Sequence, residues 1–227
     1  MNRYNLFYLI HKGLRAMLYD AAATLQQTDF TDISAAAPAL AKVNDVLFAF
    51  EHHARHEDRF ILPAVEAYEP EIAASFESEH QEDYRLTGRL RNLLIIYENS
   101  FLPEERTVCG SAITKSFTDF LTFNLQHMAK EEMLLNHALW RLYTDEQIKA
   151  IQQQLMATIT PAELQAASRW MMRAISTADA IDWLKSVRRS SPETAFDNLM
   201  KIAAEELGEA RFATVQEKLE SPLSQVA

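Results

Sequence analysis

The sequence predicts an all-α protein built on an antiparallel four-helix bundle, with additional short C-terminal helices. Glycine and proline are scarce, at four and seven of 227 residues, whereas residues that favour helices, such as alanine, leucine, glutamate and glutamine, are abundant. We find no convincing stretch that alternates between apolar and polar residues as a half-buried strand would. Four long segments of helical character, joined by short loops, come first, which is the organisation of such a bundle.

Start and stop signals place the four long helices. A loop rich in N-cap residues, TDFTDIS, follows the first helix, and the break ENSFLPEER separates the third from the fourth. Pro63 lies inside the second, where we expect a kink or an early end. The expected helices are Tyr4–Gln27, Ala35–Tyr68, Pro70–Tyr97 and Glu104–Tyr143.

The rest of the chain has a different organisation. Capping residues at Thr144, Thr160, Ser176 and Ser191 begin short helices, and a further one is expected near Gly208. We therefore divide the chain into a bundle, residues 1–143, and a helical C-terminal extension, residues 144–227. No histidine follows residue 137, so any histidine-dependent chemistry belongs to the bundle.

Charge and composition exclude several function classes. The formal net charge is −10 and the isoelectric point about 5.2, which disfavours binding to nucleic acid or to anionic membranes. The single cysteine, Cys109, rules out an internal disulfide and fits a reducing compartment. Neither a signal peptide nor a run of about 18 apolar residues is recognisable. We expect a cytoplasmic protein with no nucleic-acid or membrane partner.

Each long helix places one histidine in its apolar stripe, where residues three, four and seven apart share a face. Two of the helices add a glutamate one turn later, in the pattern His-x-x-x-Glu. One such histidine is more often a structural core residue, and one such pair is often a surface pair. The full set is harder to explain in that way. Its members are His11, His53, Glu57, His80, His127 and Glu131.

Imidazole and carboxylate ligands together suit iron, manganese or zinc. Six donors are too many for one tetrahedral zinc, and the absence of a thiolate from the set argues against an iron–sulfur cluster. A carboxylate can bridge two metals through its two oxygens, so two inward glutamates flanked by histidines predict a dinuclear centre in the bundle core. A purely structural network of buried polar groups is the alternative.

The chain resembles the hemerythrin-like family, also called the HHE cation-binding domain, in the bacterial form with a C-terminal helical extension. The resemblance rests on HKGLR, HARHEDRFILP, SEHQEDY and HMAKEEMLL, in this order, and covers about residues 1–143. It implies a non-haem di-iron centre, oxo- or hydroxo-bridged. Glu57 and Glu131 would bridge the two irons, and the four histidines would be terminal ligands.

One departure from the family pattern concerns the third helix. Classical hemerythrins have two histidines there, whereas His80 has Phe76 one turn before it and Tyr84 one turn after it. Tyr84, His56 or Glu77 could supply the missing ligand. Otherwise one iron keeps an open position, which favours reactivity over simple reversible oxygen carriage.

The leading hypothesis is a di-iron protein that binds or senses dioxygen, nitric oxide or a similar small ligand. The first alternative is a di-iron redox enzyme acting as an oxidase, peroxidase, nitric-oxide reductase or iron–sulfur repair protein. The second is a structural or interaction protein with zinc or no metal. Peroxide is a further candidate ligand, and the C-terminal helices could form a homodimer.

Overall fold

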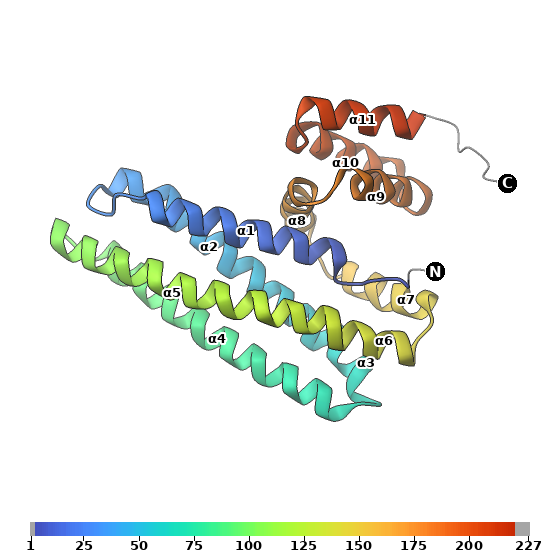
Figure 1. The fold of residues 1–227 in the computed structure, drawn as a ribbon, viewed down its shortest axis with the longest axis horizontal. Coiled ribbons are helices and arrows are strands. Elements are labelled where there is room, and N and C mark those ends of the chain that lie inside the picture. The colour runs from blue at the N-terminus through green and yellow to red at the C-terminus, as the bar shows by residue number, and fades with distance from the viewer. Residues whose placement is uncertain (1–2, 221–227) are drawn as a thin grey trace. The chain divides into compact units, whose positions relative to one another are not determined.

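The computed structural model describes residues 3–220, and this part of the chain contains helices and no strand. Two compact units are present, Met1–Ile159 and Thr160–Ala227. In the first unit, four long helices run alongside one another with alternating direction (Figure 1). They are α1 (Tyr8–Gln27), α2 (Ile33–His56), α4 (Pro70–Glu98) and α5 (Pro103–Lys130). The predicted all-α class and the bundle are confirmed.

The second and fourth predicted helices are each interrupted by one π-helical turn. The turn η1 (Glu57–Ile61) joins α2 to α3 (Leu62–Glu66), and η2 (Glu131–Leu135) joins α5 to α6 (Asn136–Leu142). The helix does not end at Pro63, which lies within the first two residues of α3. The missing N–H of Pro63 is tolerated there because the π-helical turn has already interrupted the regular series of backbone hydrogen bonds.

The first helix begins four residues later than predicted. The side chain of Asn5 accepts a hydrogen bond from the backbone N–H of Phe7 at 3.0 Å, which holds the chain in a turn before Tyr8. Upstream, the Arg3 guanidinium lies 2.6 Å from the Asp145 carboxylate. This ion pair ties the start of the chain to the start of α7 (Asp145–Met156).

Helix α7 packs with the bundle. Ile148 is fully buried, in one apolar cluster with Leu6, Ile61 and Leu139. The first compact unit therefore extends to Ile159, beyond the boundary after Tyr143 that we expected. The capping box predicted at Thr144 is present, but it marks the start of another helix of the first unit.

The second unit consists of short helices around its own small core. Thr160 and Ser176 cap their helices as predicted, whereas Pro192 rather than Ser191 occupies the N-cap position of α10, and no side chain caps that helix. Met172, Leu184 and Ala203 are fully buried. The helices are α8 (Pro161–Ala174), α9 (Thr177–Ser190), α10 (Glu193–Glu206) and α11 (Glu209–Glu220).

The continuous helical stretch Ile33–Glu66 is long and apolar enough to cross a membrane, judged by length and composition alone. Core helices of soluble bundles pass the same test. Here the stretch supplies buried side chains to the bundle, among them Val43, Leu47 and Phe50. It also carries His53 and Glu57, two of the six residues singled out in the sequence.

At the end of the bundle where α4 is joined to α5, the Phe30 side chain packs closely against Gly110. A Cβ atom there would lie 2.1 Å from Cγ of Phe30. The Tyr97 hydroxyl donates a hydrogen bond to the Phe30 carbonyl at 2.8 Å, so the loop cannot easily move away. Gly88 is also helical, but a Cβ atom there would meet nothing within 4 Å.

We predict opposite effects of alanine at these two glycines. Gly110→Ala should lower the free energy of unfolding by about 1–3 kcal/mol, because Phe30 must be displaced. Gly88→Ala should raise it by about 0.5–1 kcal/mol, because alanine is the better helix former. Urea denaturation of both variants in the same metal state measures the difference. A stabilising Gly110→Ala would show that the Phe30 contact carries no cost.

Candidate metal centre

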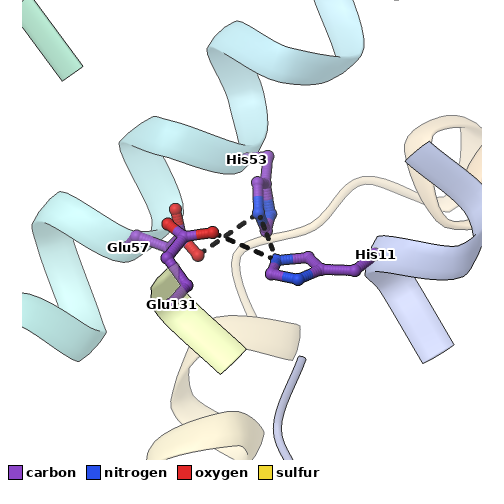
Figure 2. A group of neighbouring side chains, drawn as sticks. All are labelled: His11, His53, Glu57 and Glu131. Carbon is purple, nitrogen blue, oxygen red and sulfur yellow. Dashed lines mark hydrogen bonds and ion pairs between the residues drawn. The ribbon is translucent and has the colours of Figure 1, made fainter. Parts of the chain in front are cut away.

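The six residues predicted from helical periodicity converge inside the bundle. Each long helix contributes one histidine, and each π-helical turn begins with one glutamate. Five of the six residues are buried, and the His53 side chain is only 13% exposed. Figure 2 shows four of them pointing toward one another: His11 from α1, His53 and Glu57 from one continuous helical stretch, and Glu131 from η2.

One group of four donor atoms joins α1 and α2 to both glutamates. His11 Nε2 lies 3.1 Å from His53 Nε2 and 3.3 Å from Glu131 Oε2. His53 Nε2 lies 3.2 Å from Glu57 Oε1. Ligand atoms of these four side chains all lie within 4.8 Å of one another, which is close enough to surround one metal ion.

A second group joins α4 and α5 to the same glutamates. His127 Nε2 lies 2.9 Å from Glu131 Oε1. His80 Nε2 lies 3.5 Å from Glu57 Oε2 and 3.9 Å from Glu131 Oε1. These four side chains also offer ligand atoms within 4.8 Å of one another. The two groups share both glutamates and differ in their histidines.

Each glutamate therefore directs one oxygen to each pair of imidazoles. Glu57 presents Oε1 to His53 and Oε2 to His80, and Glu131 presents Oε2 to His11 and Oε1 to His127. Among the described residues, none of the four oxygens has a hydrogen-bond donor in good geometry. Buried carboxylates without donors are costly unless a cation compensates them, so the donor set fits two bridged metal ions.

The backbone is π-helical directly after each of these glutamates. The N–H of Leu62 bonds to the carbonyl of Glu57, and the N–H of Asn136 bonds to the carbonyl of Glu131, each five residues back. Such turns occur frequently at functional sites. Sequence reasoning missed both of them. Pro63 follows the first, but no proline follows the second, so the two turns share no proline signal.

A second layer of carboxylates orients three of the histidines. The Nδ1 atoms lie 2.5 Å from Asp58 for His80, 3.0 Å from Glu132 for His11 and 2.8 Å from Glu79 for His127. When Nδ1 donates to a carboxylate, Nε2 is left as the metal-binding nitrogen. The motifs of the resemblance included Asp58 and Glu132, but the sequence did not reveal this role for them or for Glu79.

Burial and mutual charge set the pKa values in the cluster. Burial and the charge of Glu131 raise the pKa of Glu57 to about 8. Burial lowers the pKa of His53 well below its usual range. Burial also opposes protonation of His80, but the hydrogen bond to Asp58 and the nearby carboxylates of Glu57 and Glu131 outweigh it and raise its pKa to about 12. A metal ion would take the nitrogen lone pair that this proton uses, so metal binding would release protons.

The three further ligand candidates do not join the cluster. The Tyr84 hydroxyl donates to Asp58 Oδ2 at 3.4 Å, behind His80 rather than beside the ligand atoms. Glu77 is exposed. His56 is half-buried, with its ring 6.4 Å from that of His52. His52 is half-buried against the Phe48 ring. Each group of donors thus has two histidines.

A sequence model described as the hemerythrin HHE cation-binding domain matches residues 2–139. A search of curated proteins and a search of solved structures found no match. The matched region covers more than half of the chain and includes all six converging residues. The chain therefore belongs to the hemerythrin HHE cation-binding domain family.

Proposed function

We propose that the protein is a non-haem di-iron protein that binds or senses dioxygen, nitric oxide or a similar small ligand. One observation carries the proposal: two buried glutamates each divide their oxygens between two pairs of imidazoles. A pair of cations would neutralise both carboxylates and use every donor in the cluster. Nitrogen and oxygen donors without a thiolate suit iron, with manganese and zinc as alternatives.

The lone cysteine takes no part in this site. Cys109 is buried at the other end of the bundle, where its Sγ donates to the Leu93 carbonyl. With two nitrogens and two carboxylate oxygens, each group supplies four protein donors. Iron accepts further ligands beyond four, whereas tetrahedral zinc would be complete with these donors. Metal identity therefore decides whether exchangeable positions exist.

Aromatic rings line the ligand histidines. Phe7 packs against His11 with ring centroids 5.0 Å apart. Phe76 and Phe123 lie 5.8 and 5.9 Å from the His127 ring. These side chains exclude water and favour small, weakly polar ligands over large polar ones. Iron held in this site would supply the ligand-binding and redox chemistry.

A redox enzyme is the second candidate, as an oxidase, peroxidase, nitric-oxide reductase or iron–sulfur repair protein. It is favoured by the same count of donors, because four protein ligands per iron leave positions for a reacting ligand on both sides. Turnover of peroxide or nitric oxide by the iron-loaded protein would distinguish it from a sensor. A protein that holds zinc or no metal would be structural or interact with a partner.

We predict that aerobically purified protein contains about two irons per chain and absorbs light through oxo-to-iron charge transfer, as a bridged pair should. Elemental analysis and an optical spectrum provide the measurement. A chain with no iron, or with a single zinc, would contradict both the sensor and the enzyme.

Loss of either glutamate should abolish the paired site. Glu57→Ala and Glu131→Ala each remove one donor from both groups, so each variant should lose most of its metal. His52→Ala is the matched control, because His52 packs against Phe48 and outside the donor groups. Metal content per folded chain is the measurement. Equal loss of metal in the control would show that the assignment of inward-facing residues is wrong.

Glu79 and Glu77 offer a matched test of the second layer. Glu79→Gln weakens the carboxylate contact behind His127 and should reduce iron affinity about 10–100-fold. Glu77→Gln changes an exposed acid two residues earlier on the same helix and should leave the affinity unchanged. Competition with a chelator measures both affinities. Identical affinities in the two variants would mean that Glu79 does not support the ligand.

A further inference from the structure

A buried polar pair lies next to the ligand histidines on α4 and α5. Asp83 is 3% exposed and Asn124 is 1% exposed, and Asn124 Nδ2 donates to Asp83 Oδ1 at 2.7 Å. Asp83 follows His80 by three residues and Asn124 precedes His127 by three. Because the His80 and His127 rings are 5.0 Å apart, the polar pair forms the next level of the same helix–helix interface, about 4.5 Å along the axis.

The other side of the Asp83 carboxylate lacks a protein partner. Its Oδ2 is buried, and within residues 3–220 it finds no hydrogen-bond donor. The hydroxyl of Thr87, four residues later and so on the same face of α4, is also buried without a partner. Buried polar atoms are rarely left unpaired, and internal water commonly satisfies them. These two side chains offer polar contacts to such a water.

The charge state of Asp83 depends on its surroundings. Burial raises the pKa of its carboxyl group, and the hydrogen bond from Asn124 opposes this shift. The charged groups that act on Asp83 are His80 on its own helix, His127 on α5 and Glu51 on α2. In the metal-free chain the two protonated histidines lower the pKa of Asp83 and Glu51 raises it; bound metal ions would supply the positive charge in place of those protons. Two of these three groups, His80 and His127, belong to the proposed metal centre.

We propose that Asp83 is the proton acceptor that accompanies reduction of the metal centre, through a water bound between its free oxygen and Thr87. The inference rests on the proposed di-iron function. If an external one-electron donor reduced an iron held in the cluster, the cluster would lose one positive charge. The Asp83 carboxylate then binds one proton from solvent and becomes a neutral acid. Reoxidation returns the electron to an acceptor and the proton to solvent.

The competing explanation is that the hydrogen bond between Asp83 and Asn124 only stabilises the packing of α4 against α5. Asp83→Asn separates the two, because asparagine keeps the size and can still accept the hydrogen bond from Asn124, yet cannot take up a proton. Asp119→Asn is the matched control. It makes the same change at an acid of α5 whose side chain is 48% exposed and lies beside Arg89.

The test is the pH dependence of the reduction potential of iron-loaded protein. In the unsubstituted protein and in Asp119→Asn, the potential should fall with rising pH with a slope near one proton per electron. In Asp83→Asn the slope should flatten while iron content stays the same. A slope that is the same with and without Asp83, or a potential of the unsubstituted protein that is independent of pH, would overturn the proposal.

A second measurement needs no variant and covers the outcome in which Asp83→Asn fails to fold. The reduced-minus-oxidised infrared spectrum of the unsubstituted protein should show the carbonyl stretch of a newly protonated carboxylic acid. Absence of that band would also overturn the assignment. The iron content distinguishes failure of the proposed di-iron function from failure of the role proposed for Asp83. A chain without iron contradicts the proposed function, whereas a chain with two irons and no coupled proton contradicts the role of Asp83 alone.

Discussion

The arrangement of the bundle depends on two carboxylates that have been removed from water. Glu57 and Glu131 are almost completely buried, and imidazoles rather than hydrogen-bond donors in good geometry surround them. Two negative charges at close range in an apolar core repel one another, and each is costly to desolvate. The cluster compensates by bringing one histidine from every long helix to them, so the four helices are held in register around the same two side chains.

The layers outside the cluster follow from this requirement. Asp58 and Glu132 each directly follow a buried glutamate, and each contacts the histidine of another helix. In each pair of neighbouring residues, the glutamate faces the inside of the cluster and the acid after it supports a histidine from behind. Further out, the Arg15 guanidinium lies 2.8 Å from Glu132. Burial raises the pKa of Glu132, but hydrogen bonds from His11 and Arg15 outweigh it and lower it to about 2.

Helical periodicity was sufficient to find the six converging residues, because a straight helix fixes which side chains share a face. It did not find the π-helical turns at Glu57 and Glu131, because the periodicity argument assumes a regular α-helix throughout. Glu79 was missed for a related reason: it matters through one contact with another helix, and no local pattern encodes that contact. The same limit explains Tyr84, which is one turn from His80 but reaches Asp58 instead.

A π-helical turn holds one more residue than the α-helical turn it replaces, and this has a consequence for the helices that follow. After each extra residue, the following side chains are rotated about the helix axis by about 100° from their positions in an uninterrupted α-helix. Val65 of α3 and Leu139 of α6 pack into the apolar cluster in this shifted phase. Deleting a single residue from either turn would leave a continuous helix but rotate that packing face away. The extra residue in each turn thus sets how α3 and α6 pack at this end of the bundle.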